Sequence, residues 1–149
     1  MRMDISPITM EDLPQLASLQ RELIDEEADV QKMRELLPAI LRAGNYCLLG
    51  ARKNGRLVGS LAGIVCYDLF GRCIPFMVVE NVIVTKELRR QGIGRALMKE
   101  IESVAKERGC RYIVLVSSMK REGATGFYRG LGYDTDPYRA FKRYLEPGR

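Results

Sequence analysis

One short segment of the chain combines the residue types that bind anions. Gly92 and Gly94 begin a stretch with helical apolar spacing, which follows the apolar residues 82–84. A helix N-terminus offers free backbone N–H groups and the positive end of a dipole, and glycines lack the Cβ atoms that would block access to them. Full positive charges come from three arginines of the same turn: Arg89, Arg90 and Arg95. The spacing therefore predicts a site for an anion, most simply a phosphate or a pyrophosphate.

Known phosphate motifs fit this segment unequally. The dinucleotide fingerprint needs a third glycine, where this chain has Leu97, and its glycines follow the strand closely. The P-loop needs Gly-Lys-Ser/Thr, which the chain lacks. What remains is Arg-x-x-Gly-x-Gly, made by Arg89, Gly92 and Gly94 after an apolar strand. The alternative interpretation is a tight turn and a capped helix with a solvated basic face.

This pattern resembles motif A of the GNAT family, the coenzyme A-dependent N-acetyltransferases. A second segment, in which Phe127 and Tyr128 precede Leu131, resembles the family's Ala-x-x-Phe-Tyr-x-x-Leu-Gly-Phe/Tyr pattern. The resemblance follows nearly the whole chain in order and is specific over residues 80–133. It implies acetyl-CoA as the co-substrate, with no metal.

The resemblance also implies which residues bind coenzyme A. The pantetheine arm would pair with the main chain of residues 82–84, because its amides can add to a strand edge as a peptide does. A backbone N–H near Val82 would polarise the thioester carbonyl, whose oxygen gains charge during the reaction. The implied binding residues are Val82, Ile83, Val84, Arg89, Arg90, Gln91, Gly92, Ile93, Gly94, Arg95 and Tyr128.

Glu80 is the candidate general base. The chain contains no histidine, so a base must be a carboxylate, a tyrosine, a lysine or water. Glu80 interrupts an apolar stretch, and a carboxylate is costly to bury without a partner or a wet cleft. The resemblance implies that an acidic residue at this position takes the proton of the acceptor amine, usually through water. The alternatives are an exposed strand face and a salt bridge with an arginine.

Tyr128 is the candidate general acid. It follows Phe127 on a predicted helix, so the two side chains point about 100° apart, and one packs in the core while the other reaches the cofactor. The resemblance gives the second position to Tyr128, whose hydroxyl would protonate the leaving thiolate. The alternative is a tyrosine that only packs and hydrogen-bonds. No cysteine has the setting of a nucleophile, which favours direct attack of the amine on the thioester in a ternary complex.

The elements that position these residues can be read from periodicity and turn signals. Asn54-Gly55 predicts a type I′ hairpin, Thr9 and Asp12 predict a capping box, and Gly109 predicts a helix end. Helices are predicted after Thr9, around residues 30–41 with a bend or division at Pro38, and over residues 92–108 and 121–130. Strands are predicted over residues 4–8, 47–53, 56–67, 73–85, 111–117 and 139–145, with one more starting at residues 131–133.

This order is that of the GNAT fold, an α/β (α+β) class. We expect a mixed, mostly antiparallel central sheet of six to seven strands, flanked by about four helices, in a single domain over residues 1–149. The net charge of +5 admits a polyanionic partner. The four cysteines form no Cys-x-x-Cys pair, and neither a membrane span nor a signal peptide is seen, which favours a reduced, cytoplasmic protein.

The predicted function is transfer of an acetyl group from acetyl-CoA to a primary amine. One alternative is a non-catalytic acyl-coenzyme A sensor on the same fold, and another is a basic nucleic-acid-binding module that uses residues 139–143. The acceptor, a small-molecule amine or a protein amine, is left open, and no nucleic-acid or membrane partner is expected. Homodimers are frequent in the resembling family, and the sequence leaves the oligomeric state open.

Overall fold

The computed structural model of the chain describes residues 3–146. The chain divides into two compact units, Met1–Leu115 and Val116–Arg149. The expectation of a single domain over residues 1–149 stays a prediction. Within residues 3–146, no helix combines the length and the apolar character needed to cross a bilayer.

The first unit contains one sheet with the strand order β1-β2-β3-β4-β5. Neighbouring strands are antiparallel except β4 and β5, which are parallel. The strands are β1 (Met3–Pro7), β2 (Tyr46–Lys53), β3 (Arg56–Cys66), β4 (Phe76–Val84) and β5 (Ile113–Val114). The helices of this unit are α1 (Leu13–Arg21), α2 (Val30–Ala43) and α3 (Ile93–Glu107), with short 3-10 turns η1 (Met10–Asp12) and η2 (Lys86–Leu88).

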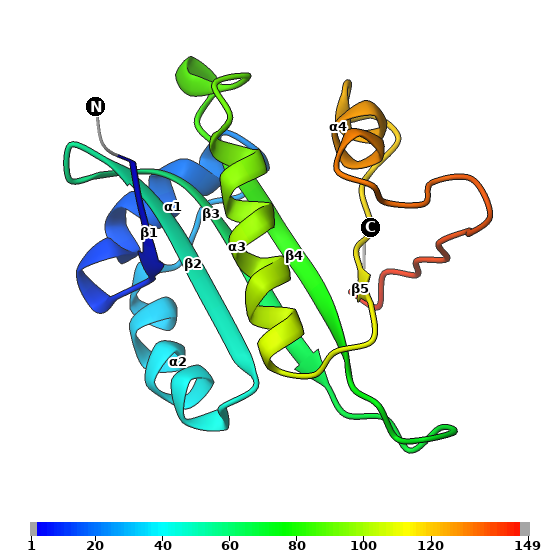
Figure 1. Cartoon of the computed structure of the whole chain (residues 1–149). Coiled ribbons are helices and arrows are strands. Elements are labelled where there is room, and N and C mark those ends of the chain that lie inside the picture. Colours follow the sequence, from blue (N-terminus) through cyan, green and yellow to red (C-terminus); the bar gives the residue numbers. More distant parts are fainter. Residues whose placement is uncertain (1–2, 147–149) are drawn as a thin grey trace. The chain divides into compact units, whose positions relative to one another are not determined.

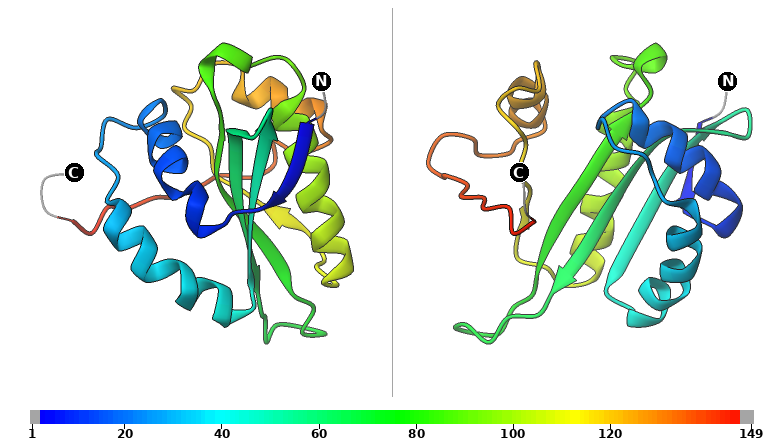
Figure 2. Two further views of the ribbon diagram at one scale, coloured as in Figure 1. Left: turned by 90° about the vertical axis from the view of Figure 1, so that its left-hand side faces the viewer. Right: turned by 180° about the vertical axis from the view of Figure 1, so that it is seen from behind.

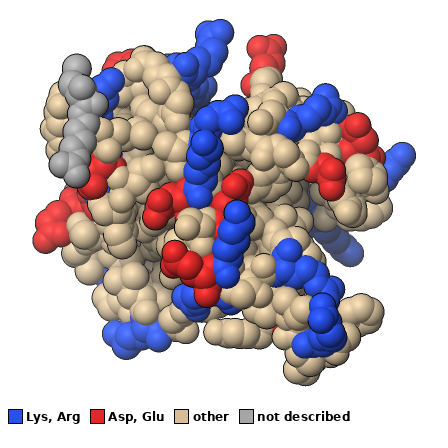
Figure 3. Space-filling view, in the orientation of Figure 1, with Lys and Arg blue, Asp and Glu red and all other residues tan. Residues whose placement is uncertain are grey.

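Helices cover both faces of this sheet (Figures 1 and 2). On one face α3 packs with Leu97, Met98 and Ile101 fully buried. Gly59 of β3 allows this close approach, because a Cβ there would lie 3.1 Å from both Ile93 and Leu97. The outer surface of α3 carries mixed acidic and basic side chains (Figure 3). On the other face, α1 and α2 complete a core cluster made of Ile8, Leu13, Leu19, Leu37, Leu57 and Ile83.

The local turn predictions are confirmed. Asn54 and Gly55 both have positive φ, 53° and 76°, as a type I′ hairpin requires. Gly109 has a φ of 72° directly after α3, as a helix-terminating glycine does. The Thr9 N–H donates to the Asp12 carboxylate at 2.7 Å, which is the predicted cap. α2 runs without interruption through Pro38, so of the predicted bend or division at this proline the division is wrong.

The predicted number of strands is too high, because the sheet has five strands among residues 3–146. No strand starts at residues 131–133: Gly132 has a φ of 93°, and the Tyr133 N–H bonds back to the Tyr128 carbonyl. Residues 139–145 are not a strand either, and Phe141 and Leu145 remain exposed. A segment of β-forming residues needs a paired neighbour and a covered face to become a strand.

The second unit has one helix, α4 (Ala124–Gly130), among its described residues 116–146. Its start, Gly123, has a φ of 76°. Near the end of α4, the Arg129 guanidinium donates to the Thr135 hydroxyl at 2.9 Å and to the Asp136 carboxylate at 3.1 Å. These contacts hold the segment that follows the helix.

Candidate active site

The predicted anion site lies on the turn between β4 and α3, which is called here the 85–92 turn after its residues. η2 forms its first part, and the Leu88 N–H donates to the Thr85 carbonyl at 3.1 Å. Arg90 and Gly92 then adopt positive φ values of 61° and 85°. A β-branched residue at such a φ would be strained, so glycine at position 92 suits this path of the chain.

Three backbone N–H groups open α3. The first helical hydrogen bond runs from the Ala96 N–H to the Gly92 carbonyl at 3.0 Å. The N–H groups of Ile93, Gly94 and Arg95 precede that bond and have no acceptor within the helix. They lie at the positive end of the helix dipole, which favours an anion.

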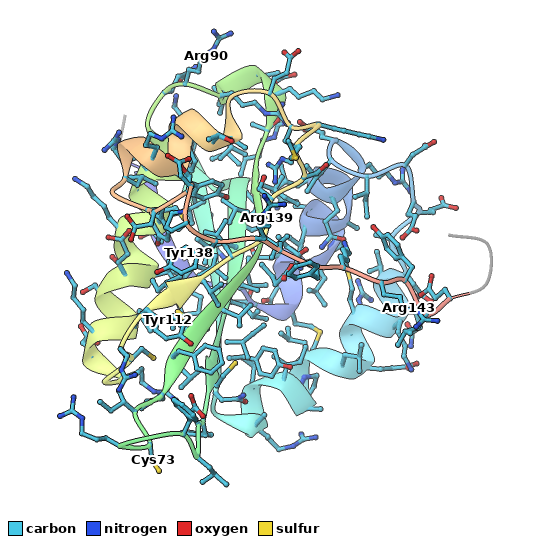
Figure 4. All side chains as sticks on the ribbon, turned by 90° about the vertical axis from the view of Figure 1, so that its right-hand side faces the viewer. Cys73, Arg90, Tyr112, Tyr138, Arg139 and Arg143 are labelled. Carbon is cyan, nitrogen blue, oxygen red and sulfur yellow. The ribbon has the colours of Figure 1, made fainter. Side chains whose placement is uncertain are left out.

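The charged side chains of the turn are accessible. Arg89, Arg90, Gln91 and Arg95 are exposed, and Arg90 points outward from the ribbon (Figure 4). Arg89 is held by its Nε, which donates to the Val84 carbonyl at 3.1 Å. The turn thus joins exposed guanidinium groups to backbone donors, the two kinds of group that bind a phosphate.

The hydrophobic members of the predicted binding set are buried. Val82, Ile83 and Ile93 expose 8%, 3% and 4% of their surface, and Val84 is half-buried. The side chains of Val82, Ile83 and Ile93 therefore belong to the core and are not open to a ligand. The main-chain role that the resemblance implies for residues 82–84 stays a prediction.

β5 accompanies only the first part of β4. The parallel ladder joins Met77 to Ile113 and Val78 to Val114. Past these rungs, residues 79–84 have no pairing with β5 in the described part of the chain. The second half of β4 therefore has one edge that β5 does not cover.

The hydrogen bonds at the end of β4 show which way its main chain points. The Thr85 N–H donates to the Val58 carbonyl of β3 at 2.9 Å. In an antiparallel pair successive residues alternate in direction, so Val84 points its N–H and carbonyl away from β3. That carbonyl accepts the Arg89 Nε instead. An extended ligand that carries amides can add to this kind of edge.

A β-bulge in β4 relates the sheet face of Glu80 to that of Ile83. Glu80 pairs with Ala62 and Ile83 pairs with Ser60, and the register shifts between these pairs. Asn81 takes up the extra residue with a φ of 56°. Glu80 consequently shares a sheet face with Ile83, the face of the core cluster against α1 and α2, although its own carboxylate remains exposed.

Tyr128 lies in the second unit, on α4, and is 7% exposed. Its ring meets those of Phe127 and Tyr133 edge to face, with centroids 4.9 and 5.9 Å apart. Burial raises the pKa of the Tyr128 phenol, and the nearby Arg121 charge only partly opposes this. The phenol therefore keeps its proton at neutral pH, as a general acid requires.

Two features of the site were not predicted from the sequence. Asn81 forms the bulge that turns Glu80 to the face of α1 and α2, and an asparagine within an apolar strand was the signal, since Asn tolerates positive φ. Glu22 of the α1–α2 region binds the start of the 85–92 turn through Thr85 and Lys86. No local pattern marks that contact.

Comparison with known proteins identifies the family of this chain. A sequence profile of the Acetyltransferase (GNAT) family matches residues 10–133. An aminoalkylphosphonate N-acetyltransferase from Salmonella typhimurium is 28% identical over 147 residues, which is 95% of each chain. An aminoglycoside N(6′)-acetyltransferase type 1 from Acinetobacter baumannii is 25% identical over 148 residues, covering 96% of this chain and 99% of the relative.

The fold is found again in solved structures. The glucosamine-6-phosphate N-acetyltransferase of Arabidopsis thaliana has a TM-score of 0.87 over 98% of this chain and 100% of its own, at 15% identity. This likeness confirms the predicted GNAT fold. The chain therefore belongs to the GNAT family of acetyltransferases, enzymes that transfer the acetyl group of acetyl-CoA to an amine.

Proposed function

We propose that this protein acetylates a primary amine on a small molecule by direct attack of the amine on acetyl-CoA in a ternary complex. The whole chain would act as one domain, in the cytoplasm. The observation that carries the proposal is the 85–92 turn, which joins exposed arginines to the N–H groups at the start of α3. The names of the Salmonella and Acinetobacter relatives, which specify small amines, support a small-molecule acceptor.

The residues of the turn fit the diphosphate of coenzyme A. Gly92 leaves the approach to the helix N-terminus open, with no heavy atom within 4 Å of the position that a Cβ would take. Arg89, Arg90 and Arg95 would neutralise the diphosphate, and the N–H groups of Gly94 and Arg95 would bond its oxygens. Acetyl-CoA supplies the acetyl group and a thiolate leaving group. The main chain of residues 82–84 would hold the pantetheine arm along the edge of β4.

Glu80 would take the proton of the acceptor. An alkyl amine has a pKa near 10, so at neutral pH nearly all of it is protonated and cannot attack. The Glu80 carboxylate is exposed on the sheet face that α1 and α2 share, where water can relay the proton to it. Deprotonation leaves the nitrogen lone pair free to attack the thioester carbon.

Tyr128 would give a proton to the thiolate as it leaves. Its buried phenol stays protonated at neutral pH, since burial raises its pKa. A thiol has a pKa near 8.5 and is already a tolerable leaving group, so this assistance need only be modest. In this proposal Glu80 is the general base that removes a proton from the amine, and Tyr128 is the general acid that supplies a proton to sulfur.

Calorimetry with acetyl-CoA and a thiol-release assay against a panel of amines test the function together. The wild type is expected to bind acetyl-CoA and to release thiol only with an acceptor. Binding without turnover on any amine would favour the sensor alternative. Absence of both heat and thermal protection would contradict the assignment of the 85–92 turn.

Gly92→Val is expected to weaken acetyl-CoA binding about tenfold or more, because valine at a φ of 85° is strained and covers the helix amides. Gly44→Val is the matched control, since Gly44 has a φ of 76° and ends α2, so the backbone strain is similar. Its acetyl-CoA affinity should equal that of the wild type. Equal losses in both variants would assign the effect to folding.

Tyr128→Phe is expected to lower kcat about tenfold and to leave the KM for acetyl-CoA unchanged, because only the acid is removed. Tyr138→Phe, at a tyrosine that is 73% exposed, is the control. The assay is thiol release at saturating substrates. An unchanged kcat in Tyr128→Phe would remove this residue from the mechanism.

A further inference from the structure

Glu22 stands where helix electrostatics disfavour a carboxylate. It is the C-cap residue of α1, and its N–H bonds the Leu19 carbonyl at 3.2 Å. The C-terminal end of a helix carries partial negative charge and favours a cation. A residue that breaks a local rule is expected to serve a contact elsewhere in the fold.

The compensating contact is with the start of the 85–92 turn. One carboxylate oxygen of Glu22 accepts the Thr85 hydroxyl at 2.8 Å, and the other accepts the Lys86 N–H at 2.6 Å. Partial burial raises the pKa of Glu22. These two bonds and the charges of Arg89 and Lys86 lower it by more than burial raises it, so the pKa is below its usual value. Glu22 is therefore ionised at neutral pH.

These bonds fix the turn from the side of α1. Thr85 is already held from the other side, because its N–H donates to the Val58 carbonyl of β3 at 2.9 Å. Its side chain is 3% exposed, so its hydroxyl needs the partner that Glu22 provides. The direction in which the chain leaves Thr85 then sets where Arg89 and the following residues of the turn lie.

We propose that Glu22 is a positioning residue for the diphosphate site, an inference that rests on the proposed function. It holds the 85–92 turn so that the arginines and the N–H groups of α3 meet the diphosphate together. Its negative charge lies close to an anion site and by itself would oppose binding. The contribution of Glu22 is thus geometric, and it couples α1 to the affinity for acetyl-CoA.

A cavity beside the contact makes the residue suitable for substitution. A cavity of about 350 Å³ lies between α1, the start of β3 and Thr85, and Glu22 is among its lining residues. Because water reaches this space, Glu22→Ala leaves a wet gap instead of a dry hole in the core. We therefore expect this variant to fold, which a thermal melt checks.

The kinetic test compares three variants. Glu22→Ala is expected to raise the KM for acetyl-CoA about tenfold, with kcat at saturation within about twofold of wild type, because ground-state positioning is lost and the chemistry is kept. Glu22→Gln is expected to restore the wild-type KM or to lower it, since its amide can accept the Lys86 N–H and donate to the Thr85 hydroxyl without the opposing charge. Glu27→Ala is the control, because Glu27 is an exposed glutamate paired with Arg21. Its KM for acetyl-CoA and its kcat should equal those of the wild type.

Hydrogen exchange of the ligand-free protein gives a second readout. Residues 85–92 are expected to exchange faster in Glu22→Ala and in Thr85→Val than in wild type. The double variant should exchange no faster than Glu22→Ala, because Glu22→Ala already removes the bond to the Thr85 hydroxyl that Thr85→Val removes. A KM and an exchange rate that stay at wild-type values in Glu22→Ala would overturn the inference, as would a loss confined to kcat. Wild-type protein that binds no acetyl-CoA contradicts the proposed function itself, whereas normal wild-type binding with an unchanged variant contradicts only the role of Glu22.

Discussion

Glu80→Gln is expected to lower kcat about 100-fold at neutral pH, which is the lower end of what a positioned general base contributes. The amide has nearly the shape of the carboxylate but cannot take a proton from the amine. Acetyl-CoA binding should be unchanged, because the proposed diphosphate site lies on the 85–92 turn and not at Glu80. Calorimetry and thiol release on the same preparation separate the two effects.

The deficit of Glu80→Gln should shrink as the pH rises. Near pH 10 about half of an alkyl amine is already unprotonated, so the base is needed less. A ratio of wild-type to variant kcat that falls from about pH 7 to about pH 10 is therefore the signature of a base. A ratio that is constant with pH would indicate a positioning role for Glu80 instead.

Glu107→Gln serves as the matched control for that experiment. Glu107 is an exposed glutamate at the end of α3, the helix on the opposite face of the sheet. Its substitution removes the same charge from the same unit and should leave kcat at the wild-type value. If both glutamine variants lost activity equally, the loss would come from net charge, and Glu80 would have no special part.

Local features of the fold and of the site were predictable because neighbouring residues create them. The hairpin at Asn54-Gly55, the end of α3 at Gly109 and the cap at Thr9 each depend on a few adjacent residues. The turn before α3 is also a local feature, since Gly92 lies close in sequence to Arg89 and Arg90. The propensities of such short segments survive in the folded chain because tertiary contacts do not oppose them.

Features that depend on distant partners were not predictable. Glu22 meets Thr85 across 63 residues, and no periodicity marks either residue as the other's partner. The bulge at Asn81 depends on how β4 pairs with β3, and this register decides which face Glu80 occupies. The prediction of a strand over residues 139–145 failed for a related reason, because a segment without a paired neighbour forms no sheet.

Loss of the largely buried ion pair between η1, directly before α1, and the sheet is expected to have the largest effect on stability. Arg52 of β2 forms an ion pair with Asp12, and their side chains are only 15% and 10% exposed. The Arg52 guanidinium also bonds the Ser6 hydroxyl at 2.7 Å and the Pro7 carbonyl at 3.1 Å. This cluster joins β1, β2 and the start of α1 across 40 residues of sequence.

Arg52→Met is expected to lower the free energy of unfolding by about 3 kcal/mol at neutral pH, because it leaves the Asp12 carboxylate buried without its cation. Adding Asp12→Asn to that variant should recover part of the loss, since an amide carries no charge and still accepts the Thr9 N–H. Arg56→Met is the control: Arg56 is 65% exposed and 3.9 Å from Glu87, so its removal should cost less than about 0.5 kcal/mol. Urea unfolding measures all four proteins.

The pH dependence identifies the charge as the cause. Burial raises the pKa of Asp12, but hydrogen bonds from Arg52 and Thr9 and the Arg52 charge lower it below the usual 3.8. The unfolded state therefore binds a proton at Asp12 more readily than the folded state does. The contribution of the ionised Asp12 to stability is complete above the usual pKa, and it is lost as the pH falls through the lower pKa of the folded state. The difference in stability between wild type and Arg52→Met should accordingly narrow below about pH 4, where the unpaired carboxylate becomes neutral in the variant. A difference that stays constant with pH would mean that packing of the Arg52 stem, and not its charge on Asp12, holds β1 and α1 to the sheet.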